Sequence, residues 1–82
     1  MNKYTYQFIS ACPANGEHIV YLLDIVSEHM IHVEKIKTAC ALHRIGYHES
    51  IADSLADTFK DCLQVLSANH HGVQIETIRG DL

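Results

Sequence analysis

The spacing of apolar residues changes twice along the chain, and this pattern constrains the fold more than any other feature. Residues 4–11 alternate between apolar and polar, and residues 17–27 form a second segment rich in Ile, Val and Leu. From about His32, apolar residues recur at intervals of three and four, and alternation returns after residue 62. A period of two is typical of strands and a period near 3.6 of helices. The pattern therefore predicts strands at both ends of the chain and helices between them.

Turn-forming residues mark the boundaries of these elements. Cys12-Pro13-Ala14-Asn15-Gly16 separates the first two extended segments, because Pro lacks a ladder donor and Asn-Gly tolerates positive φ. Gly46 is predicted to end the first helix, and Asn69-His70-His71-Gly72 to form the turn between strands at 63–68 and 73–79. The predicted element order is ββααββ.

The second extended segment is apolar on both faces. One face carries four residues and the other carries three: Ile19, Tyr21, Leu23 and Ile25, and Val20, Leu22 and Val26. A strand of this kind has material packed on both sides, so it is predicted to be central or to lie against a partner subunit. On the first strand, Tyr4, Tyr6 and Phe8 share a single apolar face.

Two helices are predicted between the hairpins. Val33, Ile36 and Cys40 form the apolar stripe of the first, and Ile51, Leu55 and Phe59 that of the second. The most economical packing of these elements is an α+β fold, a four-stranded antiparallel sheet with two helices on one face. The other face of the sheet is left open, and apolar residues there need a partner.

The length and the cysteines restrict the class of protein further. With 82 residues, the chain is predicted to form a single domain, residues 1–82, whose small core favours a homo-oligomer. Three cysteines without a C-x-x-C pair argue against a secreted disulfide scaffold and a zinc ribbon. The first residues alternate instead of forming an apolar signal sequence, and no stretch approaches the roughly 20 apolar residues that span a membrane. We therefore expect a cytoplasmic protein.

The charge argues against nucleic acid as a partner. The net charge is −4, and only six Lys and Arg residues are scattered along the chain. A nucleic-acid interface requires clustered basic residues that neutralise phosphates. Nucleic acid is therefore not an expected partner.

Two short motifs resemble those of a known protein family. Residues 8–17, FISACPANGE, are similar to the F-x-S-x-C-P-x-T-G-Q segment of the NADPH-dependent nitrile reductases that act on 7-cyano-7-deazaguanine. Tyr47-His48-Glu49 resembles their F-H-E at the start of the second long helix, and residues 73–76 fit their last strand. The chain thus resembles the tunnelling fold, which also includes GTP cyclohydrolase I. Its subunits join edge to edge into a β-barrel ringed by helices.

The resemblance implies roles for three residues. Cys12 would be the nucleophile that forms a covalent thioimide, and His48 would carry a proton. Glu49 would anchor a purine, deazapurine or pterin, because a carboxylate accepts two parallel N–H bonds from a guanine-like edge. Each residue also has a structural alternative: a small apolar residue beside a turn, a surface histidine, and a first-turn carboxylate that suits the helix dipole.

The sequence also departs from the reductase pattern. Ile19 stands where the reductases carry a catalytic aspartate, with Glu17 or His18 as nearby substitutes. Residues 33–37, VEKIK, match the NADPH-binding stretch only in part, so NADPH stays an open alternative and is not predicted as the cofactor. Some relatives that lack this stretch transfer nitrogen to a nitrile on tRNA, which the acidic charge here does not support. The C-x-x-H zinc element of the cyclohydrolases is absent, and neither Cys12 with His18 nor His70 with His71 predicts a metal site.

Two hypotheses of different classes follow. The first is a small enzyme or enzyme relative that binds a guanine-like heterocycle at a subunit interface, with Cys12, His48 and Glu49 in the roles above. The second is a non-catalytic binding or assembly module of the same fold. A histidine-based metal protein is a third alternative. The sequence leaves the choice open.

Overall fold

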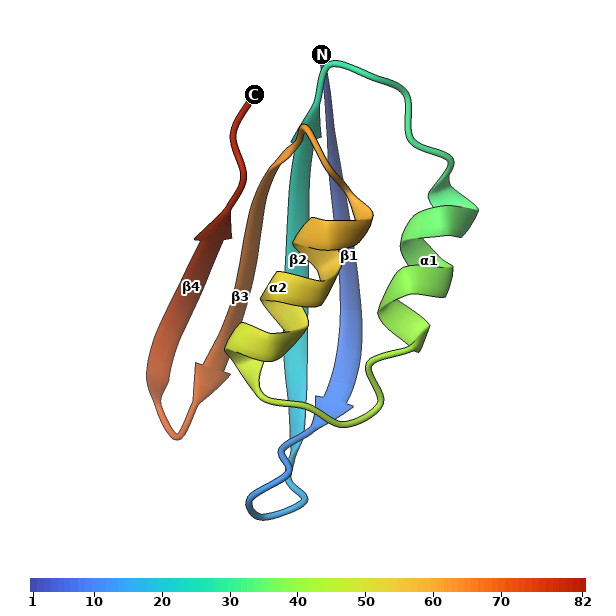
Figure 1. Cartoon of the computed structure of the whole chain (residues 1–82). Coiled ribbons are helices and arrows are strands. Elements are labelled where there is room, and N and C mark those ends of the chain that lie inside the picture. The colour runs from blue at the N-terminus through green and yellow to red at the C-terminus, as the bar shows by residue number, and fades with distance from the viewer.

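The chain forms six elements in the predicted order ββααββ (Figure 1). The computed structural model describes residues 1–82. The bounds of the elements are β1 Asn2–Ala11, β2 His18–Ser27, α1 Val33–Ala41, α2 His48–Thr58, β3 Leu63–His70 and β4 Val73–Arg79. All strands belong to one antiparallel sheet in the order β1-β2-β3-β4. The predicted α+β fold class is confirmed.

Strand β2 is internal in the sheet, as its two apolar faces predicted. Tyr21 on β2 pairs with Phe8 on β1 and with Ala68 on β3. β1 and β4 are the edge strands. Their outer backbone groups have no strand neighbour within the chain.

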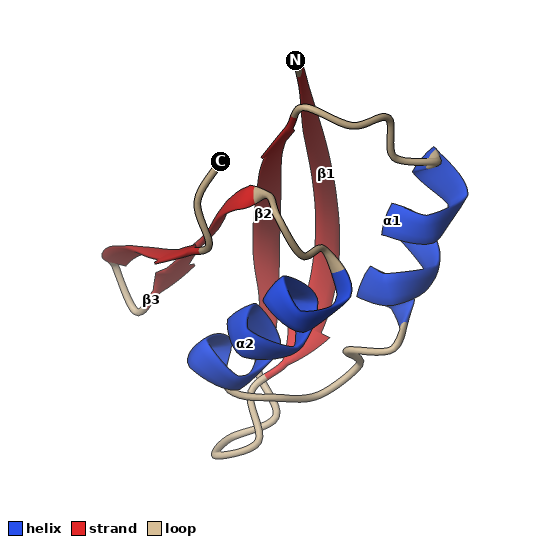
Figure 2. Ribbon diagram, turned by 45° about the horizontal axis from the view of Figure 1, so that its top comes forward, coloured by secondary structure: helices blue, strands red, loops and turns tan.

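Both helices cover the same face of the sheet (Figure 2). The residues of β2 that point to this face are buried, and they meet buried residues of α2 such as Ile51 and Leu55. These side chains belong to one core cluster of 15 buried residues. Burying one large aliphatic side chain stabilises a fold by roughly 1.5–3 kcal/mol, so this face holds the sheet and helices together.

The opposite face of the sheet is covered by no element of this chain. It carries the exposed side chains of Ile9, Val20 and Ile78 from β1, β2 and β4. Neither helix has the length and apolar character of a membrane-crossing helix.

Helix α1 ends earlier than the position of Gly46 predicted. It stops at Ala41, and the following loop bonds to the end of β1: the Ala11 amide donates to the Arg44 carbonyl at 2.9 Å, and the Gly46 amide donates to the Ala11 carbonyl at 3.1 Å. These bonds hold the loop extended. Within the predicted apolar stripe of α1, Val33 is exposed while Ile36 and Cys40 are buried.

Strand β3 extends two residues beyond its predicted end. It continues to His70, and the hairpin turn is His71-Gly72, with φ values of 51° and 87°. Two central residues with positive φ are characteristic of the tightest hairpin turns. The Asn69 side chain accepts a hydrogen bond from the Gly72 amide at 2.9 Å. Because side chains alternate along a strand, His70 shares the helix-covered face with Leu66 and Ala68.

Candidate functional site

The two motifs of the sequence are held together by the backbone. Ala11 directly precedes Cys12. It forms hydrogen bonds with Arg44 and Gly46 of the α1–α2 loop, and Gly46 lies two residues before His48. In the hairpin turn, the Cys12 amide donates to the Glu17 carbonyl at 2.8 Å, and the Cys12 carbonyl accepts from the Gly16 amide at 2.7 Å. Cys12 is a half-buried free thiol. The nucleophile candidate and the start of α2 are therefore fixed at the same end of the sheet.

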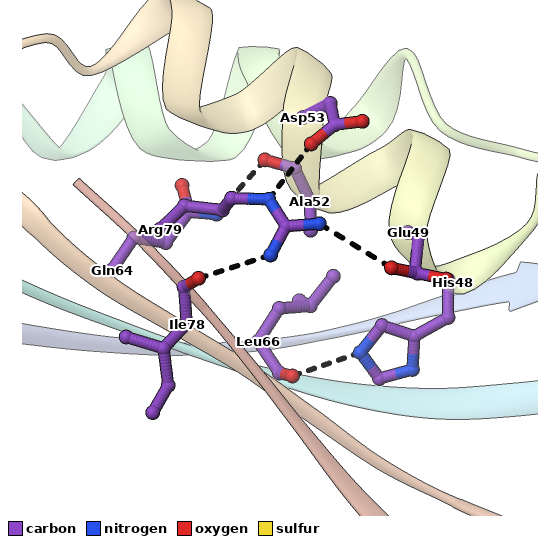
Figure 3. Close-up of polar contacts among 8 residues, drawn as sticks. All are labelled: His48, Glu49, Ala52, Asp53, Gln64, Leu66, Ile78 and Arg79. Carbon is purple, nitrogen blue, oxygen red and sulfur yellow. Dashed lines mark hydrogen bonds and ion pairs between the residues drawn. The ribbon is translucent and has the colours of Figure 1, made fainter.

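His48 is the first residue of α2, and its imidazole points into the protein. It is only 7% exposed. Its Nε2 lies 2.9 Å from the carbonyl oxygen of Leu66 (Figure 3), and its Nδ1 lies 3.2 Å from Nε2 of His70. Both ring nitrogens of His48 therefore have partners within the chain.

Tyr21 packs against this histidine pair. Its ring lies edge-on to His48 and His70, with centroid distances of 5.2 and 6.2 Å, and stacks on Phe8 at 5.3 Å. The Tyr21 hydroxyl is buried without a hydrogen-bond partner. Burial raises the pKa of Tyr21, and a negative charge on Cys12 raises it further. In the sequence, Tyr21 was placed only on one of the two apolar faces of its strand.

A pocket of about 570 Å³ opens beside the first turn of α2. It is lined by Tyr47, His48, Glu49, His70, Ile75 and Thr77. Its volume lies within the range of roughly 300–1,000 Å³ that is usual for small-molecule sites. The pocket combines an exposed aromatic ring, a carboxylate, two imidazoles and a hydroxyl.

Glu49 lies at this pocket and reaches solvent. Its side chain is 83% exposed, and its Oε1 lies 3.5 Å from Nη2 of Arg79. Arg79 makes a closer contact with Asp53, one turn further along α2, at 2.8 Å between Nε and Oδ1 (Figure 3). Nearby, the Gln64 side chain donates to the Ala52 carbonyl at 3.0 Å and fastens α2 to β3. These contacts hold the helix that presents Glu49.

The pocket includes two of the three predicted site residues. His48 and Glu49 line it, whereas Cys12 does not. His70 also lines the pocket, although the sequence placed it in a turn. The signal that identifies its position is the His71-Gly72 turn, which leaves His70 in phase with the inward residues of β3.

No acidic side chain takes the place of the aspartate that the reductase pattern expects. Ile19 is buried in the core. Its neighbour His18 is exposed and, by strand alternation, lies on the opposite face of the sheet from Tyr21. Glu17 lies 3.7 Å from His71 at the surface. Nor is any group of three or more His, Cys, Asp and Glu side chains arranged to hold a metal ion.

Comparison with known proteins identifies the fold. No protein-family model and no curated protein matches the sequence. Among solved structures, the chain is similar to the archaeosine synthase QueF-Like in its apo form, with a TM-score of 0.78 and 15% sequence identity. The similarity covers 95% of this chain and 89% of the other. The chain therefore has the fold of this archaeosine synthase, and the subunit fold expected from the resemblance is confirmed.

Proposed function

We propose that the chain binds a guanine-like heterocycle, a purine, deazapurine or pterin, in the pocket beside α2. The main support for this proposal is the position of Glu49. It is the carboxylate of a pocket of about 570 Å³, and its side chain is 83% exposed. A carboxylate accepts two parallel bonds from the ring N–H and the amino group of a guanine-like edge.

The other lining residues suit a flat polar ring. Tyr47 is 57% exposed and offers an aromatic face on which a heterocycle can stack. Ile75 adds an apolar wall, and Thr77 and His70 add hydrogen-bonding groups. The fold shared with an archaeosine synthase supports a deazapurine-related ligand.

Titration with 7-cyano-7-deazaguanine, followed by calorimetry, tests this proposal. We expect saturable binding that weakens about tenfold or more in Glu49→Gln, because a charge-assisted bond is worth roughly 1.5–3 kcal/mol. Asp53→Asn is the matched control. Asp53 pairs with the same Arg79 but does not line the pocket. Equal binding by the two variants would show that Glu49 is not the anchor.

The proposal extends to nitrile chemistry at Cys12. The Cys12 thiol would give its proton to the histidine pair, and the thiolate sulfur would then form a C–S bond to the nitrile carbon. One π pair of the nitrile would move to its nitrogen, to which the histidine pair would return a proton, leaving a neutral thioimide and a neutral pair. Cys12 is the only free thiol of the chain that is not buried, and this accessibility supports the step. Since Cys12 does not line the pocket of one chain, the ligand would meet it at a subunit interface.

Intact-mass spectrometry separates this chemistry from simple binding. Incubation with 7-cyano-7-deazaguanine should add the mass of one ligand to the wild type and none to Cys12→Ala. Cys62→Ala, which alters a buried thiol, is the control that should keep the adduct. Binding without an adduct would favour the alternative, a non-catalytic binding or assembly module.

The proposed interface requires a homo-oligomer. The free edges of β1 and β4 offer unpaired backbone groups for strand pairing between copies. The exposed apolar residues of the open sheet face, such as Val20 and Ile78, would be covered in a closed assembly. Light scattering during size-exclusion chromatography should give the mass of two or more chains of 9.2 kDa each. A monomer at all concentrations would contradict the interface.

A further inference from the structure

The bonds of His48 determine which ring nitrogen carries its hydrogen. The Leu66 carbonyl, 2.9 Å from His48 Nε2, can only accept a hydrogen bond, so Nε2 carries the hydrogen. In neutral His48, Nδ1 is then the acceptor for His70 Nε2, which lies 3.2 Å away and must donate. Both nitrogens of His48 are occupied, and its side chain is only 7% exposed. His48 has no free nitrogen for a ligand.

We propose that His70 is the group of this pair that takes up a proton when the heterocycle binds and donates a hydrogen bond to it, and that His48 is its positioning residue. With His70 Nε2 donating to His48, Nδ1 of His70 carries a lone pair and has no partner within the chain. His70 lines the same pocket as Glu49. This inference rests on the proposed function and assigns a role in it to a residue that the motifs did not include.

The hydrogen-bonding groups of the ligand determine whether His70 Nδ1 must donate or accept a hydrogen bond. A guanine-like edge that gives its ring N–H and amino hydrogens to Glu49 leaves mainly acceptors, a carbonyl oxygen and ring nitrogens, for the rest of the pocket. An acceptor placed at His70 Nδ1 requires a donor there. Binding is therefore coupled to the uptake of a proton from solvent by His70 Nδ1, which then donates to the ligand.

The surroundings of His70 keep it neutral in the free protein. His48 and Tyr21 pack against its ring, and His71 follows it in the turn. Burial lowers the pKa of His70, and positive charge on His48 or His71 lowers it further. Glu49 is the carboxylate of the same pocket, and its charge is shared with Arg79. The free protein therefore holds His70 neutral near pH 7, and only a ligand that accepts from Nδ1 reverses this.

Calorimetry in two buffers of different ionisation heat measures the coupled proton. Titration of the wild type with 7-cyano-7-deazaguanine at pH 7 should show proton uptake approaching one per ligand, and affinity should fall up to tenfold per pH unit as the pH rises towards the pKa of the complex. His70→Gln keeps a donor at the position of Nε2 but cannot titrate, so it should lose the uptake. His71→Gln alters a neighbouring histidine whose side chain is 71% exposed and should keep it.

Each result has a separate meaning. Binding without proton uptake in the wild type, or uptake that persists in His70→Gln, would overturn the role of His70 while the binding site stands. Absence of any binding heat would refute the proposed function, and the proton role would fall with it. Imidazole ¹H–¹⁵N correlation spectra of the free protein test the pair itself. They should show the Nε2–H tautomer for both histidines, and an Nδ1–H tautomer at His48 would overturn the arrangement.

Discussion

Glu49 and Arg79 form an ion pair between α2 and β4, with 3.5 Å between Oε1 and Nη2, and Arg79 bonds more closely to Asp53 at 2.8 Å. Because the pairs are exposed, salt and solvent weaken both. In double-mutant cycles with Arg79→Gln, followed by urea unfolding, we expect a larger coupling for Asp53→Asn than for Glu49→Gln. The reverse order would mean that Glu49 is engaged in structure and is not free to anchor a ligand.

The stability of the fold should fall in mild acid. Since the pKa of His70 lies below its ordinary value of 6.5, the unfolded chain binds a proton more readily than the folded chain. His70 should therefore leave the free energy of unfolding constant above about pH 6.5 and make it decrease as the pH falls below that value, towards the lowered pKa. Urea midpoints between pH 5 and pH 8 measure this decrease.

His70→Gln should make that decrease smaller. It should not abolish it, because burial also lowers the pKa of His43. An unchanged pH profile in His70→Gln would show that the folded protein does not disfavour the protonated form of His70.

The Tyr21 hydroxyl contributes no hydrogen bond within the chain. Tyr21→Phe should therefore leave the free energy of unfolding unchanged or raise it by up to about 1 kcal/mol, because an unpaired buried hydroxyl is removed. Tyr21→Ala should cost roughly 3–5 kcal/mol through the loss of core packing. Chemical denaturation of both variants checks this. A loss of more than about 1 kcal/mol in Tyr21→Phe would reveal a partner for the hydroxyl in solution.

Gly80 directly follows β4 and lies against the backbone of Cys62. A Cβ at this position would lie 2.1 Å from the Cys62 carbonyl oxygen, and its φ is +77°. Gly16 has a similar φ of +73° but open space around it. Gly16→Ala should cost about 1–2 kcal/mol for the left-handed conformation alone, and Gly80→Ala should cost clearly more. Thermal unfolding of the two variants provides the comparison, and equal losses would contradict the close contact.

Periodicity was sufficient for most of the fold because alternation is a local property. The residues that share one face of β2 by their spacing, from Ile19 to Ile25, are buried, and α2 buries Ile51 and Leu55. The end of α1 could not be predicted in this way. It is determined by bonds from Ala11 to Arg44 and Gly46, more than thirty residues away in the sequence.

The candidate site was predictable only where a motif identified it. Glu49 and His48 follow from the resemblance of Tyr47-His48-Glu49 to the reductases, and both line the pocket. His70 was considered only as a metal ligand in a turn, because its contact with His48 joins residues 22 positions apart in the sequence. His48 Nε2 is bonded to the backbone carbonyl of Leu66. A contact with a backbone group leaves no pattern in the sequence, so it could not be predicted.

The affinities for guanine and hypoxanthine test the central claim most directly. The two bases differ by the amino group that Glu49 is proposed to bind. Calorimetric titration should give guanine the tighter binding by about tenfold or more, since one charge-assisted bond is worth roughly 1.5–3 kcal/mol, and Glu49→Gln should remove most of the difference. Equal affinity of the wild type for the two bases would contradict Glu49 as the anchor of a guanine-like ligand.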